Sequence, residues 1–218
     1  YGLDMAVYAG DFLFTKAVLM LSKDIPLKRL DIVARGIKTI CEGEVDQYQE
    51  RYNIDSTVVS YLKRISRKTA VLFGAACGLG SFSSKCQEDI AKNLAKFGFY
   101  YGIAFQIRDD LNDFVSSEGS AGKPVGKDIS EGVFTLPVIY AMNNCPKIKN
   151  LLLEFSVKKD KAAADDISNV IDMVRTNGGI ENTEIMLGRY IERGLRVLDV
   201  LPDNAYKTIF ENLIRSLG

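Results

Sequence analysis

The sequence has 218 residues, of which 47% are hydrophobic. This is enough to bury one sizeable core, so a single domain over residues 1–218 is expected. Lys and Arg (28) balance Asp and Glu (28), so no global field draws the chain to nucleic acid or to an anionic membrane surface. The chain contains no histidine, which excludes Ser-His-Asp and Cys-His catalysis and histidine-dependent zinc hydrolysis.

The cysteines and the uncharged stretches indicate in which cellular compartment the protein is expected. None of the four cysteines stands in a C-x-x-C pair, so reduced thiols in a cytoplasmic protein are expected. The longest uncharged stretch, Thr69 to Ser84, is shorter than the roughly 20 residues of a spanning helix, and no membrane span is predicted. Residues Tyr1 to Ala9 carry no basic signal segment and no initiator methionine, so an upstream segment is expected.

Apolar residues recur at spacings of three and four along nearly the whole chain, which predicts an all-α fold. In chain order, the predicted helices are Asp4–Ser22, Pro26–Tyr52, Ser56–Ile65, Lys68–Gly80, Ser84–Val115, Leu136–Asn143, Lys147–Ser156, Ala162–Asn177, Ile180–Leu201 and Asp203–Leu217. Asn177-Gly178-Gly179 supplies a left-handed stop. The one long polar insertion, Ser116–Asp128, has a length typical of functional or disordered loops.

The helix predicted to end at Val115 carries an acidic face. At 3.6 residues per turn, Gln106, Asp109, Asp110 and Asp113 fall within an arc of about 100°. Clustered carboxylates repel one another unless a cation joins them, and Mg²⁺ takes oxygen ligands from carboxylates and from substrate phosphate. The face therefore fits a magnesium–diphosphate site. The alternative is a solvated helix face, although the apolar neighbours predict that much of this helix is buried.

Two basic segments would complement these acids. Arg67, Lys68 and Thr69 are predicted to open a helix, where a cation, a hydroxyl and free backbone N–H groups would suit a diphosphate. An ordinary charged pair at a helix start is the alternative. Lys123 and Lys127 lie in the polar insertion, as in a lid that closes on phosphate, and a solvated lysine loop fits equally well.

Taken in order, these segments resemble the trans-prenyl diphosphate synthases over essentially the whole chain. The matching segments are Ala9-Gly10-Asp11-Phe12-Leu13, Glu42-Gly43-Glu44-Val45-Asp46-Gln47, Arg67-Lys68-Thr69-Ala70, Phe105-Gln106-Ile107-Arg108-Asp109-Asp110, and Gly122-Lys123-Pro124-Val125-Gly126-Lys127-Asp128 continuing to Thr135-Leu136-Pro137. Five matches in the right order are far more specific than one. A finer likeness is to the catalytic component of two-component heptaprenyl diphosphate synthases.

The resemblance implies an isoprenoid-synthase-type helical bundle around a central cavity, of which this chain is the larger, C-terminal part. It implies that Asp109, Asp110 and Asp113 bind Mg²⁺ on the allylic diphosphate. The other implied site residues are Lys68, Thr69, Lys123 and Lys127 as substrate contacts, and Phe105 and Gln106 near the reacting carbons. Of all these, Lys68, Gln106, Asp109 and Lys123 would be catalytic.

The implied chemistry joins isopentenyl diphosphate to an allylic diphosphate. The allylic diphosphate ionises, the isopentenyl double bond attacks the cation, and a proton is lost to the departing diphosphate. Metal ions and lysines neutralise the leaving group, so no histidine base is needed. Leu72, Phe73 and Ala76 would form a dry wall and a trough for the growing chain, a role that is compatible with ordinary core packing.

The sequence departs from the family pattern at its start. The first aspartate-rich motif would lie upstream of Gly2, so the 218-residue chain alone is expected to be inactive. A homodimer is expected, with a heterodimer as the alternative. A class I terpene cyclase would share the fold, but the two-lysine loop after the acids favours the synthase. A non-catalytic helical partner subunit is the remaining alternative.

Overall fold

The computed structural model describes residues 2–24, 27–115, 126–158 and 164–218. These residues form helices joined by turns and contain no strand, which confirms the predicted all-α class. The chain divides into two compact units, Tyr1–Lys38 and Thr39–Gly218.

The first unit consists of α1 (Leu3–Asp24) and the start of α2 (Leu27–Gln49). By length and composition, Leu3–Lys23 would be able to cross a membrane. Asp11 and Lys16 interrupt this segment, so it is not an uncharged stretch. At the centre of a bilayer, each of these charges would cost about 3 kcal/mol. Length and composition are therefore weak grounds for a membrane role of α1.

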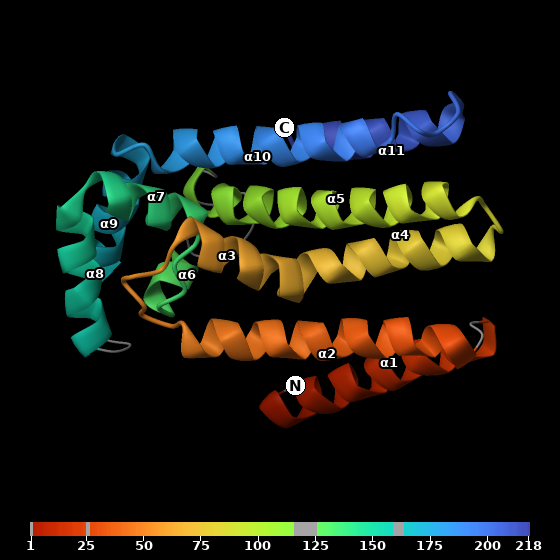
Figure 1. Ribbon diagram of the computed structural model, residues 1–218. Helices are drawn as coiled ribbons and strands as arrows, with labels where there is room; N and C mark the ends of the chain where they lie inside the picture. Colours follow the sequence, from red (N-terminus) through yellow and green to blue (C-terminus); the bar gives the residue numbers. More distant parts are fainter. Residues whose placement is uncertain (1, 25–26, 116–125, 159–163) are drawn as a thin grey trace. The chain divides into compact units, whose positions relative to one another are not determined.

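The second unit is organised around one long helix, α5 (Glu88–Val115), which lies between α4 and α10 (Figure 1). Short helices gather beside the carboxyl end of α5. The other elements of this unit are the end of α2, α3 (Val58–Ile65), the π-helix η1 (Ser66–Ala70), α4 (Val71–Ser83), α6 (Lys127–Ser130), α7 (Leu136–Asn144), α8 (Pro146–Lys158), α9 (Ala164–Thr176), α10 (Gly179–Val197) and α11 (Ala205–Arg215).

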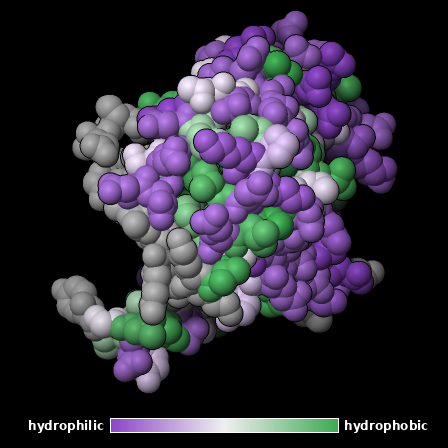
Figure 2. Space-filling view, turned by 90° about the vertical axis from the view of Figure 1, so that its left-hand side faces the viewer, coloured by the Kyte–Doolittle hydropathy of each residue, from purple (hydrophilic) through white to green (hydrophobic). Residues whose placement is uncertain are grey.

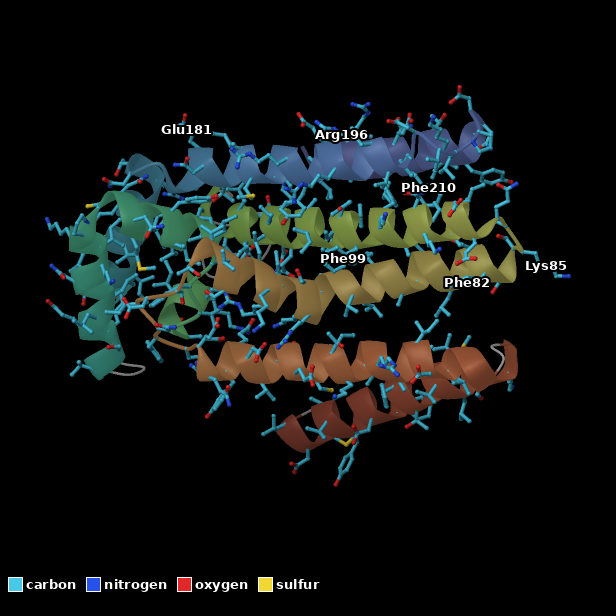
Figure 3. The ribbon with its side chains drawn as sticks, in the orientation of Figure 1. Phe82, Lys85, Phe99, Glu181, Arg196 and Phe210 are labelled. Atoms are coloured by element: carbon cyan, nitrogen blue, oxygen red, sulfur yellow. The ribbon has the colours of Figure 1, made fainter. Side chains whose placement is uncertain are left out.

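Apolar side chains of α5 form the middle of the core. Ile103, Ile107 and Leu111 are fully buried, as their 3.6-residue spacing predicts. Nearer the amino end of α5, Phe97 packs against Phe210, with 5.1 Å between the ring centroids. The Phe210 side chain points inward from α11 (Figure 3). The face near α8 and α9 is largely hydrophilic (Figure 2). The helix that carries the acids at its carboxyl end is thus fixed by buried apolar contacts from Phe97 to Leu111.

Glycines allow α5 to lie very close to its neighbours. A Cβ atom on Gly102 would lie 2.6 Å from the Cα of Ala70, and one on Gly98 would meet the carbonyl oxygen of Phe73. Side chains at these positions would force the helices apart, because real Cβ atoms do not approach backbone atoms so closely. The close approach places η1 directly against α5.

We expect Gly98→Ala to destabilise the protein by about 1–3 kcal/mol, because overpacking against a backbone carbonyl outweighs the gain in helix propensity. Gly80, on α4, is the matched control, since nothing lies within 4 Å of a Cβ atom there. Gly80→Ala should stabilise by about 0.5–1 kcal/mol. Urea unfolding followed by circular dichroism measures both changes. Equal effects of the two substitutions would contradict the close packing of α4 on α5.

The helices agree with the sequence predictions to within a few residues, with two differences. The predicted break between Ile65 and Lys68 is wrong, because α3 continues through η1 into α4 without an end. The short helix α6 lies in a segment that was expected to be a loop. The predicted left-handed stop at Asn177-Gly178-Gly179 is confirmed, with Gly178 at a φ of 75°. Asn204 caps α11, its Oδ1 accepting from the N–H groups of Tyr206 and Lys207.

Candidate functional site

A cavity of about 250 Å³ opens in the second unit at the carboxyl end of α5. Its wall is mostly polar and comes from α2, α3, η1, α5, α6 and the segment before α7. The lining residues are Gln47, Tyr61, Arg64, Ile65, Lys68, Gln106, Asp109, Asp110, Asp128, Val133 and Thr135. Four residues predicted from the sequence, Lys68, Gln106, Asp109 and Asp110, are therefore brought together.

Lys68 and Thr69 lie in η1, a π-helical turn that widens an otherwise continuous helix. Such turns are rare and often lie at functional sites. The N–H of Ser66 bonds to the carbonyls of Leu62 and Lys63, and that of Val71 bonds to Ser66. The prediction of free N–H groups at a positive helix end is therefore wrong. Since no residue between Ile65 and Thr69 disfavours helix, the chain does not stop there.

The end of α2 holds the Lys68 ammonium at the cavity wall. Its Nζ lies 3.1 Å from Oε1 of Glu44 and donates a hydrogen bond of 3.2 Å to Oε1 of Gln47. The adjacent Arg67 pairs with Asp46 at 2.6 Å. Gly43 permits this contact, since a Cβ atom there would lie 2.8 Å from the backbone nitrogen of Lys68.

The predicted acids differ in their surroundings. Asp109 is exposed at the cavity wall and Asp113 is half-buried, whereas Asp110 is only 6% exposed. Oδ2 of Asp110 accepts a 2.7 Å hydrogen bond from the Tyr61 hydroxyl, and Oδ1 accepts one of 2.8 Å from Nε2 of Gln106. Burial raises the pKa of Asp110 to about 7, against the lowering effect of these two donors. Both oxygens of Asp110, the middle acid of the three, thus accept hydrogen bonds from side chains of the protein itself.

Asp128, on α6, is a fourth acid of this group that sequence analysis did not single out. Burial raises the pKa of its carboxyl group, and the nearby carboxylates of Asp113, Glu131 and Asp109 act in the same direction. Lys68 opposes them. The signal in the sequence is its place directly after Lys127, in a segment that matches the family.

The chain just after α2 fixes α6 beside the cavity. Nε of Arg51 donates to the Glu131 carbonyl at 2.6 Å, and the N–H of Tyr52 donates to the Gly132 carbonyl at 2.7 Å. Gly132 has a φ of 75°, and a Cβ atom there would lie 2.6 Å from the Tyr52 ring. A glycine is therefore required at this turn by both backbone and space. These contacts hold Asp128 in place.

The remaining predicted residues are distributed as follows. The Thr69 hydroxyl donates a 2.7 Å hydrogen bond to Oε1 of Gln106. Phe105 is 40% exposed, and its ring centroid lies 5.5 Å from that of Phe73. The Lys127 side chain is 60% exposed, lies 3.5 Å from Glu131, and is not part of the cavity wall. Lys123 lies outside the described residues.

The donor chemistry fits a magnesium ion that is shared with a phosphate. Within residues 2–24, 27–115, 126–158 and 164–218, no three Cys, Asp or Glu side chains converge as a metal cage. Mg²⁺ commonly takes only one or two carboxylates and completes its shell with water and substrate phosphate. Asp109 and Asp113 offer such hard oxygen donors, and Asp128 adds a further negative charge beside Lys68.

Comparison with known proteins shows extensive sequence similarity. A family model described as Polyprenyl synthetase matches residues 1–174. Heptaprenyl diphosphate synthase component 2 of Geobacillus stearothermophilus is 34% identical over 213 residues, which cover 98% of this chain and 65% of that protein. Octaprenyl diphosphate synthase of Escherichia coli (strain K12) is 30% identical over 207 residues, which cover 95% of this chain and 64% of that protein. The chain thus spans less than two thirds of the length of these relatives.

Solved structures show the same fold. The heptaprenyl diphosphate synthase from Staphylococcus aureus superposes with a TM-score of 0.94 at 28% identity, covering 100% of this chain and 67% of that chain. A polyprenyl synthase from Caulobacter crescentus CB15, complexed with calcium and isoprenyl diphosphate, superposes with a TM-score of 0.91 at 28% identity, covering 98% and 65%. These neighbours confirm the predicted isoprenoid-synthase type of helical fold.

Proposed function

The chain belongs to the polyprenyl synthetase family, and we propose that it is a magnesium-dependent trans-polyprenyl diphosphate synthase. In this proposal, isopentenyl diphosphate condenses with an allylic isoprenoid diphosphate to give a longer trans-polyprenyl diphosphate. One observation carries it: Asp109 and Lys68, 41 positions apart in the sequence, line one cavity. Opposite charges facing a shared space suit a diphosphate held together with a divalent cation.

We propose that Asp109 and Asp113 hold Mg²⁺ together with the allylic diphosphate. The bound ion would neutralise negative charge on the leaving group. Lys68 adds a fixed positive charge at the wall, and the contacts with Glu44 and Gln47 keep its ammonium in position before the substrate arrives. Lys123 is proposed as a further diphosphate contact. Since Lys127 is paired with Glu131, it would contribute only after leaving this partner.

Apolar side chains beside the acids support the proposed route of the prenyl chain. Leu72 is 59% exposed and Phe105 is 40% exposed, unusual values for such residues in a packed helix pair. The rings of Phe73 and Tyr101 continue this surface, with centroids 5.1 Å apart. An apolar wall would keep water away from an allylic cation, and the same wall would receive the hydrocarbon tail.

A dimer is proposed for the assembled protein. On α1, Leu3, Tyr8 and Phe12 are each largely exposed, and an exposed apolar helix face supports association with another chain. A homodimer is the first proposal, and a heterodimer is the second because two relatives are named as component 2 of their synthases. The four thiols are free, which supports the proposed cytoplasmic location.

The proposal predicts binding that depends on the metal. We expect farnesyl S-thiolodiphosphate, an analogue that ionises very slowly, to bind the 218-residue chain at least about tenfold more tightly with Mg²⁺ than without it. Isothermal titration with Mg²⁺, and with EDTA as the control, measures the difference. An affinity that does not change with Mg²⁺ would favour a non-catalytic partner subunit. Product analysis with isopentenyl diphosphate, on a form of the protein that also carries a first aspartate-rich motif, then tests chain elongation directly.

A further inference from the structure

Four side chains form a continuous hydrogen-bonded row, and three of them, Tyr61, Asp110 and Gln106, line the cavity. The Tyr61 hydroxyl donates to Asp110 at 2.7 Å, and Nε2 of Gln106 donates to the same carboxylate at 2.8 Å. At the far end, the Thr69 hydroxyl donates to Oε1 of Gln106 at 2.7 Å. Residues from α3, η1 and α5 are thereby joined in one row.

The chemistry of the groups fixes the direction of each bond. Both oxygens of Asp110 accept, one from the Tyr61 hydroxyl and one from the Gln106 amide. The Gln106 amide satisfies one of them with its nitrogen, and its oxygen must then face Thr69. The Thr69 proton is used in that bond, which leaves the lone pairs of Oγ1 for other partners. The position of the Asp110 carboxylate therefore decides which way the Gln106 amide is turned at the cavity wall, and with it the bond from Thr69.

The buried end of the row is rigid. Tyr61 has no exposed surface, and the guanidinium carbon of Arg64 lies 5.6 Å from its ring centroid. Arg64 is itself held by Glu50 at 3.0 Å and by the Phe134 carbonyl at 2.8 Å. Burial raises the pKa of the Tyr61 hydroxyl well above its usual value, so this group is a neutral donor.

We propose that Tyr61 is a positioning residue, which acts through Asp110 to fix the orientation of Gln106 at the cavity wall and, through Gln106, of its partner Thr69. This inference rests on the proposed function, and it deepens it by assigning Asp110 to positioning instead of metal coordination. Asp109 and Asp110 then have separate tasks although they are neighbours in the sequence. Asp109 faces the cavity, whereas both oxygens of Asp110 are bound by side chains.

The side-chain NH₂ signal of Gln106 tests the row without any turnover. It can be identified in the ¹⁵N-labelled chain by its absence in Gln106→Met. In Tyr61→Phe we expect this signal to shift and its protons to exchange with water about tenfold faster, because the carboxylate that binds them loses its anchor. Tyr190→Phe is the matched control, since Tyr190 lies in the same core cluster and is distant from the row in sequence. An unchanged Gln106 signal in Tyr61→Phe would overturn the proposal.

Circular dichroism would reveal whether Tyr61→Phe fails to fold. In that case a second variant, Asp110→Asn, tests the same proposal. Asp110→Asn keeps the size of the side chain but removes its charge and replaces one acceptor by a donor, so the hydrogen bond from Gln106 Nε2 must either weaken or turn round. The Gln106 signal should shift here too, and an unchanged signal would again overturn the proposal. Because these spectra need no ligand, a failure of Mg²⁺-dependent binding in the unmodified chain would count against the proposed function alone.

The effect on catalysis separates positioning from stability. In a form of the protein that elongates prenyl chains, Tyr61→Phe should lower kcat about tenfold and leave the KM for isopentenyl diphosphate within about twofold. Tyr190→Phe should change neither value. A Tyr61→Phe variant with unchanged kcat would contradict the assigned role, even if its thermal stability were reduced.

Discussion

Asp109→Ala should abolish the Mg²⁺-dependent gain in affinity for an allylic diphosphate. In a form of the protein that elongates prenyl chains, it should also lower turnover by at least about 100-fold. The reason is that Asp109 is the exposed acid at the cavity wall, where its carboxylate would meet the metal and the leaving group. The core should not suffer, because the buried neighbours of Asp109, Ile107 and Leu111, are untouched.

Asp89→Ala is the matched control for this experiment. Asp89 is also exposed and lies in the first turn of the same helix, at the end opposite the cavity. Isothermal titration with and without Mg²⁺, together with steady-state product formation, should separate the two variants. If Asp109→Ala retained the Mg²⁺-dependent gain and most of the turnover, Asp109 would not be a metal ligand.

Arg64→Ala should reduce the free energy of unfolding by about 3 kcal/mol. Arg64 is 4% exposed and binds Glu50 with one nitrogen and the Phe134 carbonyl with another. Its removal leaves a partly buried carboxylate and a buried carbonyl without their donor. Because Glu50 keeps some contact with water, the cost should lie at the lower end of that for fully buried pairs.

Arg196→Ala provides the comparison for a solvent-exposed ion pair. Arg196 projects from the outer face of α10 (Figure 3) and lies 3.4 Å from Glu192, with both side chains mostly exposed. Its replacement should change the stability by no more than about 0.5 kcal/mol. Urea unfolding of both variants gives the two values. A loss below about 1 kcal/mol for Arg64→Ala would show that the buried pair holds little of the fold together.

Much of the fold follows from periodicity, and the one wrong helix boundary has a clear cause. The buried apolar residues of α3 and η1 are Tyr61, Ile65 and Ala70. They are separated by a step of four residues and then by a step of five. A jump in the apolar pattern is read as the end of a helix, whereas the chain absorbs it in a π-helical turn.

The candidate site was predictable only where its residues are neighbours in sequence. Gln106, Asp109 and Asp110 share a face because of helical geometry alone, and they do line one cavity. Tyr61 meets Asp110 across 49 positions, and Asp128 comes near Asp109 only because α6 is held by Arg51 and Tyr52. Such pairings depend on the folding of distant segments, which a single sequence does not encode in any local pattern.

The wide turn at Ser66–Ala70 has a consequence for how this helix tolerates change. It places one additional residue between Ile65 and Ala70, whose side chains both stay buried. A regular helix would bridge the same interval with one residue fewer. The extra residue therefore gives the neighbourhood of Lys68 and Thr69 room for one more polar group. Ile65 and Ala70 thus hold the helix in the core, whereas Lys68, between them, is available to the cavity.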